Sequence, residues 1–184
     1  MHNLNNIYYF IEEFKESELD KLNSRKISII YRNYSKNYNI SEIIDLKKYC
    51  KKRSLKLFLA NDFKLAWKLN LNGAYIPAFN NSLKHQLYPK KHNFLIMGSS
   101  HNLKEIKLKI KQGCKKIFLG PLFKVSKKKN YLGLFNFRNL AGISRVEIIA
   151  LGGINNQNLR KLKISGGSGF ASISYIKKTA QKSG

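Results

Sequence analysis

Two patterns in the sequence predict an α/β fold, and more specifically a compact (β/α)8 TIM barrel. Short apolar segments rich in Ile, Leu and Phe recur along the chain, as expected of strands that are buried on both faces. Stretches with apolar residues three or four positions apart lie between these segments and indicate helices. Strands that alternate with helices form a parallel sheet, and about eight such strands close a barrel.

The predicted strands cover residues 7–10, 27–31, 55–60, 73–77, 94–98, 116–120, 146–151 and 169–174. Two of the intervening helices are clear from their spacing. One begins near Ile40, with Ser41 near its cap. The other follows Asn102, a favoured N-cap residue, and is predicted to turn inward the side chains of Leu103, Ile106, Ile110 and Cys114.

The length of the chain limits this barrel. The chain has 184 residues, whereas a (β/α)8 barrel typically takes about 250. Helices and loops must therefore be minimal, and the segment 79–91 is especially short for a fourth helix. An open doubly wound sheet is the alternative fold. No stretch rich in Pro, Gly or Ser divides the chain, so a single domain over residues 1–184 is expected.

The net charge of +25 would favour nucleic acid, anionic lipid or phosphorylated metabolites as partners. The basic residues are spread along the whole chain, however, and mark predicted helix faces such as the one with Lys104, Lys107, Lys109 and Lys111. We interpret most of them as solvated helix surface. Phosphorylated small molecules are therefore the expected partners, and nucleic acid is not.

Targeting signals and cysteine chemistry are absent from the sequence. No apolar run approaches the ~20 residues that a membrane span needs, and the N-terminus shows no secretory pattern. Cys50 and Cys114 have neither CxxC nor Cys/His ligand spacing. They are predicted to be free thiols, which favours a cytoplasmic location.

The most informative segment runs from Ile148 to Asn158 and contains Gly152 and Gly153 at the end of a buried apolar run. A strand that ends in Gly-Gly at the start of a helix exposes unpaired N–H groups at the positive end of a helix dipole. The segment 169–174 repeats small residues at a strand end. Two such ends in succession predict a phosphate held between two loops, as in many barrels. Close packing alone is the alternative reason for the glycines.

Polar residues follow the second and third predicted strands as well. Arg32 stands where a guanidinium could grip a phosphate with two hydrogen bonds. Asn61 and Asp62 come next in order, and an acid at this point could hold Mg²⁺. A helix N-cap is an equally good interpretation of Asp62.

The fifth and sixth predicted strands are followed by candidate phosphate ligands. Ser99 comes directly after Gly98, which would let a ligand approach the backbone closely. Gly120 and Pro121 lead into a lysine-rich loop that includes Lys127 and could close over a polyphosphate, although such a charge run taken alone is more often a solvated loop. No Ser-His-Asp or Cys-His arrangement, GxGxxG or P-loop is present.

Taken in order, these residues resemble the thiamine-phosphate synthase family, with its thiazole tautomerase relatives. The resemblance covers nearly the whole chain and is strongest from Phe94 onward. Its motifs are Tyr31-Arg32, Asn61-Asp62, Gly73-Ala74-Tyr75-Ile76, Ser99-Ser100-His101, Gly120-Pro121-Leu122-Phe123 with Lys127, Ala150-Leu151-Gly152-Gly153-Ile154 with Asn158, and residues 169–174.

The resemblance implies a barrel that joins a hydroxymethylpyrimidine pyrophosphate to a thiazole phosphate, releases pyrophosphate and uses Mg²⁺. It implies that Asp62 binds the metal and that Asn61 binds substrate beside the catalytic residues Ser99, Lys127 and Arg32. The thiazole phosphate would be held by Gly152, Gly153 and the backbone of Ile173 and Ser174. Cations and oriented donors that neutralise the departing pyrophosphate fit this chemistry.

The chain departs from the family pattern mainly in the pyrophosphate and metal half. The altered positions are Ile30, Tyr34, Phe63, Tyr75, Asn80 and Val125, of which Asn80 stands where a second metal-binding Asp is expected. Two alternatives therefore stay open. One is a divergent paralogue that binds a phosphorylated thiazole-like ligand without this catalysis, or a thiazole tautomerase, although those relatives tend to carry His at the position of Pro121. The other is a basic nucleic-acid-binding domain.

Overall fold

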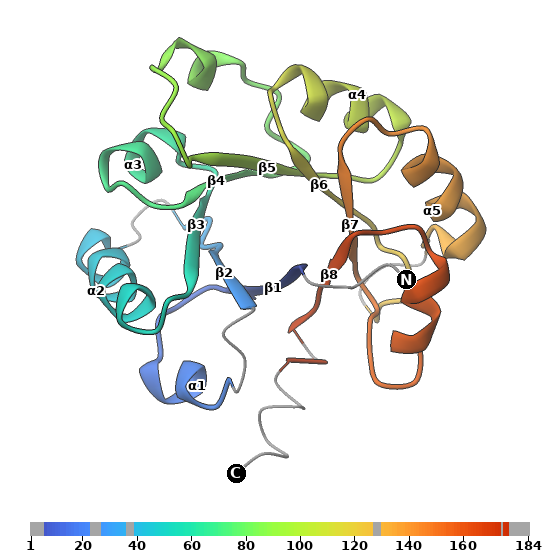
Figure 1. Ribbon diagram of the computed structural model, residues 1–184, viewed down its shortest axis with the longest axis horizontal. Helices are drawn as coiled ribbons and strands as arrows, with labels where there is room; N and C mark the ends of the chain where they lie inside the picture. Colours follow the sequence, from blue (N-terminus) through green and yellow to red (C-terminus); the bar gives the residue numbers. More distant parts are fainter. Residues whose placement is uncertain (1–5, 23–26, 36–38, 127–129, 174, 177–184) are drawn as a thin grey trace.

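The protein forms a closed barrel of eight parallel strands in the order β1 to β8, with β8 paired to β1 (Figure 1). The structure is a computed structural model that describes residues 6–22, 27–35, 39–126, 130–173 and 175–176. The predicted (β/α)8 barrel is confirmed, and the pairing of Ile7 in β1 with Phe170 in β8 excludes the open sheet.

The strands are β1 (Asn6–Ile11), β2 (Ile27–Tyr31), β3 (Lys56–Ala60), β4 (Gly73–Ile76), β5 (Leu95–Ser100), β6 (Lys116–Leu119), β7 (Glu147–Leu151) and β8 (Gly169–Ala171). The helices between them are α1 (Glu16–Asp20), α2 (Ile40–Lys52), α3 (Phe63–Lys68), η1 (Lys84–Leu87), α4 (Leu103–Lys111), α5 (Gly133–Gly142) and η2 (Leu159–Ile164). The elements η1 and η2 are short 3₁₀ helices, which explains how the barrel closes within this length.

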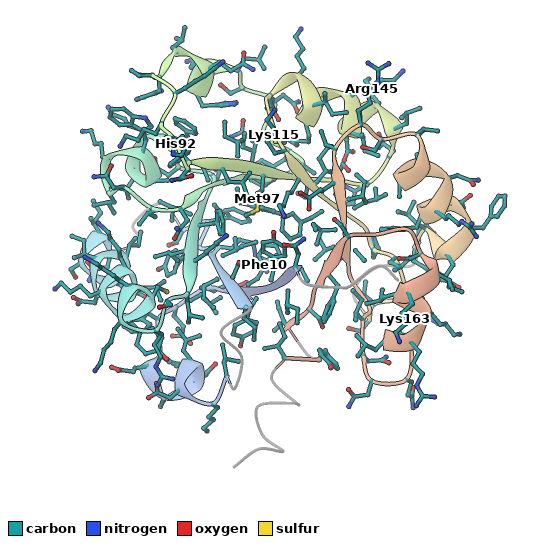
Figure 2. All side chains as sticks on the ribbon, in the orientation of Figure 1. Phe10, His92, Met97, Lys115, Arg145 and Lys163 are labelled. Carbon is teal, nitrogen blue, oxygen red and sulfur yellow. The ribbon has the colours of Figure 1, made fainter. Side chains whose placement is uncertain are left out.

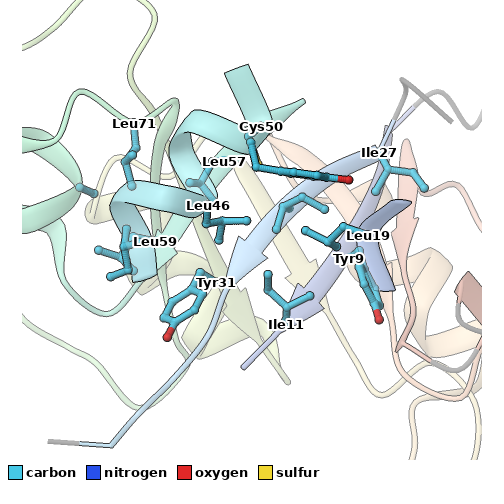
Figure 3. Packing of buried hydrophobic residues seen from close by; sticks show 14 of the residues in the cluster. Tyr9, Ile11, Leu19, Ile27, Tyr31, Leu46, Cys50, Leu57, Leu59 and Leu71 are labelled. Atoms are coloured by element: carbon cyan, nitrogen blue, oxygen red, sulfur yellow. The ribbon is translucent and has the colours of Figure 1, made fainter. Parts of the chain in front are cut away.

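Strand alternation sorts the apolar side chains into two layers. Alternate residues point into the barrel, where the rings of Tyr8, Phe10, Tyr75 and Phe118 meet edge to face with centroids 4.8–5.7 Å apart. The other residues pack outward against the helices. Figure 3 shows part of this outer layer, with Leu46 of α2 beside β3. In Figure 2, Phe10 lies within the ring of strands.

Two sequence predictions about strand ends are wrong. The strand β5 runs to Ser100, so Ser99 lies in the strand and not after it. The strand β8 ends at Ala171, and Ile173 is already helical, because Ser172 caps the helix that follows. The predicted start of α2 near Ile40, with Ser41 near the cap, is confirmed: the cap is Asn39, whose side chain accepts a hydrogen bond from the backbone N–H of Ser41.

The inner face of α4 also differs from its prediction. Ile106 and Cys114 are buried as expected, but Leu103 and Ile110 are 38% and 37% exposed. Lys109 takes the inward position instead and is completely buried. The predicted cap is confirmed, since Asn102 accepts a hydrogen bond from the backbone N–H of Glu105 at 2.9 Å. No described helix is long and apolar enough to cross a membrane.

Candidate functional site

The candidate site residues follow the carboxyl ends of the strands. Arg32 comes directly after β2, Asn61 and Asp62 after β3, Gly152 and Gly153 after β7, and Ile173 after β8, while Ser99 lies near the end of β5. All strands are parallel, so these ends form a single mouth, the usual place for a site in this fold. Lys127 and Ser174 lie outside the described residues.

Tyr75, a buried residue of β4 whose ring packs among the inner rings of the barrel, connects several candidates. Its ring contacts Phe10 at 5.3 Å between centroids, and the Arg32 guanidinium lies 5.0 Å over the ring of Phe10. Its side chain hydrogen-bonds Ser99, and its carbonyl accepts the N–H of Asn61 at 2.8 Å. Burial raises the pKa of Tyr75 and the hydrogen bond with Ser99 opposes this shift, so the phenol stays protonated at neutral pH. Arg32, Asn61 and Ser99 therefore all lie around Tyr75: Ser99 bonds its side chain, Asn61 bonds its backbone carbonyl, and Arg32 lies over the neighbouring ring of Phe10.

The guanidinium of Arg32 also pairs with a carboxylate. Its Nη2 lies 3.2 Å from Oε1 of Glu12, whose side chain is 73% exposed. Such an exposed ion pair contributes little to stability. Arg32 is thus held above Phe10 by its planar face and can exchange its carboxylate partner for another anion at low cost.

Asn61 and Asn80 form a hydrogen-bonded corner above β3 and β4. The Nδ2 of Asn80 donates to Oδ1 of Asn61 at 2.8 Å, and Oδ1 of Asn80 accepts the backbone N–H of Ser82 at 2.9 Å. Asp62 accepts the N–H of Leu65 at 2.8 Å and is the N-cap of α3, as one interpretation of the sequence proposed.

These residues do not fit a Mg²⁺ site built by the protein. Mg²⁺ requires near-octahedral oxygen ligands. Here the amide oxygen of Asn80 is taken by Ser82, and one oxygen of Asp62 is taken by the cap. Among the described residues, no group of three or more His, Cys, Asp and Glu side chains is suitably placed for a metal ion.

The glycines after β7 are required by the backbone. Gly152 and Gly153 have φ of +91° and +70°, and an added Cβ would come within 3 Å of Pro121 and Phe123 respectively. The predicted helix directly after them is wrong: η2 begins only at Leu159. Close packing, the alternative interpretation, therefore explains why both residues are glycine. Still, in the described part of the chain no acceptor contacts the N–H groups of Gly152 or Gly153.

Ser172 joins the two strand ends at this side of the mouth. Its hydroxyl donates to the carbonyl of Ile154 at 3.0 Å and accepts the N–H of Tyr175 at 3.1 Å. It therefore ties the Gly-Gly loop to the first turn of the helix that starts at Ile173. Asn158 holds the other side of the loop, since its Nδ2 donates to the carbonyl of Gly153 at 2.8 Å.

Sequence reasoning overlooked Ser172 and Tyr75 as site residues. A serine before a helix is an N-cap signal, but the helix was missed because the segment was predicted to be strand. From the sequence, Tyr75 is part of a family motif and a departure from the family pattern, with no role of its own. The Ser100 hydroxyl is buried and has no hydrogen-bond partner within the described residues. The ring of His101 pairs with Glu105 at 3.0 Å.

A pocket of about 230 Å³ opens beside the Asn61–Asn80 corner. It occupies the place where a fourth α-helix would cover β4, between α3 and the connection that contains η1. Its polar wall comes from Lys64, Ser82, Lys84 and His85. The predicted thin fourth unit thus leaves space at the edge of the mouth.

The chain shows sequence similarity to known proteins over most of its length. A family model described as thiamine monophosphate synthase matches residues 13–176. A thiamine-phosphate synthase from Methanococcus vannielii is 26% identical over 149 residues, which cover 77% of this chain and 71% of that protein. One from Prochlorococcus marinus is 32% identical over 143 residues, or 76% of this chain, although the match spans only 41% of that protein.

The fold is also found in a solved structure. The thiamine phosphate pyrophosphorylase from Pyrococcus furiosus superposes with a TM-score of 0.74 and covers 98% of this chain and 94% of that one, at 18% identity. This likeness supports the fold alone. The family match over residues 13–176, in contrast, shows that the chain belongs to the thiamine monophosphate synthase family.

Proposed function

We propose that the chain is a thiamine-phosphate synthase, which joins hydroxymethylpyrimidine pyrophosphate to a thiazole phosphate and releases pyrophosphate. The observation that carries this proposal is the pair of N–H groups on Gly152 and Gly153, beside the helix start at Ile173. Backbone N–H groups next to a helix N-terminus favour a phosphate. The thiazole phosphate would bind here, with Ser174 completing the site.

In the proposed reaction, the bond between the pyrimidine methylene and the pyrophosphate oxygen breaks and its electron pair leaves with pyrophosphate. The thiazole nitrogen then forms the new C–N bond. The departing charge must be neutralised, so Arg32 would exchange Glu12 for pyrophosphate, and Asn61, Ser99 and Lys127 would donate hydrogen bonds to it. No protein nucleophile is needed.

The Mg²⁺ dependence stays a proposal that rests on the family. The family resemblance implies Asp62 as the metal ligand, and this residue already caps α3. Any Mg²⁺ that the reaction needs would be coordinated mainly by substrate oxygens and water. The roles given above to Arg32, Asn61 and Ser99 do not depend on it.

A second candidate is a paralogue that binds the thiazole phosphate without catalysis. The observation that favours it is Asn80, a neutral amide where the family pattern has a second metal-binding Asp, whose side chain already hydrogen-bonds Ser82 and Asn61.

One experiment separates the two candidates. Purified protein is incubated with both substrates, with and without Mg²⁺, beside a known synthase, and thiamine phosphate is measured by fluorescence after oxidation. Binding of the thiazole phosphate is measured separately by calorimetry. Product formation supports the synthase. Thiazole phosphate binding without product supports the paralogue, and the absence of both refutes the two candidates together.

A further inference from the structure

Lys109 is a fully buried lysine in the helix layer of the barrel. Its stem crosses β5 at Gly98, where an added Cβ would lie 2.8 Å from Cδ of Lys109. Its Nζ lies 2.8 Å from the carbonyl oxygens of Pro77 and Asn80 and 2.9 Å from Oε1 of Gln112. All three ammonium donors are thus satisfied, which offsets part of the cost of burying the charge.

These bonds fasten the connection between β4 and β5 to α4. The connection has only the short η1 and no α-helix of its own to hold it. Gln112 adds to the attachment, because its Nε2 donates to the carbonyls of Asn80 and Ser82, each at 2.9 Å. Residues 77–82 are therefore held from below by two side chains at the end of α4.

The attachment fixes the direction of two amide groups. The backbone N–H of Ser82 can only donate, so the Asn80 atom that it meets must be the oxygen. The Asn80 nitrogen then faces Asn61 and requires its oxygen. Consequently Asn61, which is exposed, offers a ligand its own amide nitrogen, which has no hydrogen-bond partner among the described residues. This nitrogen is a donor and suits an anion.

We propose that Lys109 is a positioning residue for the pyrophosphate half of the site. It fixes residues 77–82 so that Asn80 turns Asn61 into a hydrogen-bond donor toward the diphosphate substrate. This inference rests on the proposed function, but it also predicts how the protein binds inorganic pyrophosphate.

The test compares Lys109→Met, which keeps the stem and removes the ammonium, with Lys111→Met, which removes an exposed charge from the same helix. In Lys109→Met, KM for the diphosphate substrate should rise about tenfold, as expected when a charge-assisted hydrogen bond is misplaced, while KM for the thiazole phosphate stays within about twofold. Lys111→Met should leave both values unchanged. A purely structural role would lower the melting temperature without separating the two substrates.

Asn80→Ala provides a second variant should Lys109→Met fail to fold. It removes the amide that orients Asn61 and should produce the same selective loss, and the double variant should lose no more than either alone. Calorimetry with inorganic pyrophosphate gives a readout that is independent of turnover. Wild type that binds pyrophosphate but makes no product would refute only the proposed function. The inference is overturned if wild type binds no pyrophosphate, if the folded variants bind it as wild type does, or if KM rises equally for both substrates.

Discussion

Because Gly98 has no side chain, the side chains of Lys109 and Cys114 can pack directly against its backbone. The sequence suggested that this glycine lets a ligand approach the backbone, but the space beside it is filled by Lys109, Cys114 and the carbonyl of Ile76. A lysine can lie under the helix layer because its stem takes the place of a Cβ.

We therefore predict that Gly98→Ala destabilises the protein by about 1–3 kcal/mol, the usual cost of overpacking a core. The new Cβ would lie 2.8 Å from Lys109 Cδ and 2.9 Å from Cys114 Sγ. Gly142→Ala is the matched control, since no atom of the described residues lies within 4 Å of a Cβ there. Urea unfolding of both variants measures the difference, and equal midpoints would contradict the packing argument.

Ser172 makes a second prediction at this scale. Ser172→Ala removes the N-cap and the bond to Ile154, which should cost about 1 kcal/mol and raise KM for the thiazole phosphate. Ser168→Ala, before the amino end of β8, removes only hydrogen bonds of 3.3–3.4 Å and should change neither value by as much. Unfolding and steady-state kinetics of the two variants measure this, and unchanged thiazole phosphate binding in Ser172→Ala would contradict the assigned role of the loop.

Among the elements, the connection between β4 and β5 is the most unusual, because a cluster of rings replaces a helix. Phe63 of α3 contacts the rings of His85, Tyr88 and Phe94 with centroids 5.2–5.4 Å apart. This cluster covers β4 where the chain is too short for a fourth α-helix.

Phe63→Ala should therefore destabilise the protein by about 3 kcal/mol, as large-to-small substitutions among packed aromatic rings do. Phe135→Ala is the matched control, because this ring is 77% exposed on α5 and should shift the unfolding free energy by no more than about 0.5 kcal/mol. Chemical unfolding gives both numbers. A similar loss in the two variants would show that the cluster does not substitute for the helix.

At the scale of the whole molecule, the exposed lysines surround the barrel. They lie on four different helices, namely α2 with Lys48 and Lys52, α3 with Lys64, α4 with Lys107, and η2 with Lys163. This distribution agrees with the interpretation of a solvated surface. A nucleic-acid-binding domain would instead gather its basic residues on one face.

The buried thiols and phenols make stability depend on pH. Burial raises the pKa of the Cys50 and Cys114 thiols to about 12, and burial also raises that of Tyr9 and Tyr31 to about 12. An unfolded thiol ionises near pH 8.5. Between these values the unfolded chain has lost protons that the folded chain retains, so the unfolding free energy falls as pH rises.

We predict a loss of about 2 kcal/mol per thiol between pH 8 and pH 10, measured by urea unfolding. Lys109 acts in the opposite direction, because burial lowers its pKa and its deprotonation favours the folded state as pH rises. One such group cannot offset two thiols and two phenols. The double variant Cys50→Ala, Cys114→Ala should show a clearly shallower decline, and an unchanged decline would assign the effect to other groups.

The sequence by itself determined the strands, their parallel arrangement and the family. These features depend on local patterns: apolar runs bounded by polar turns, and short motifs that follow each strand. The predicted strand 27–31 agrees with β2 to the residue, and Asn102 caps α4 as predicted. Errors at strand ends occurred where a cap and a strand residue have similar local signals, as at Ser172.

Only the tertiary structure decided the inward face of α4 and the direction of the amides at the mouth. A local sequence pattern places Lys109 on the polar face of the helix. It is buried because Gly98 leaves room for its stem and the carbonyls of Pro77 and Asn80 accept its hydrogen bonds, and all three residues belong to other segments of the chain. The direction of the Asn61 amide likewise depends on a distant residue, because the Asn80 nitrogen donates to its oxygen. A buried polar group is acceptable only where distant partners satisfy its hydrogen bonds, and folding alone brings those partners together.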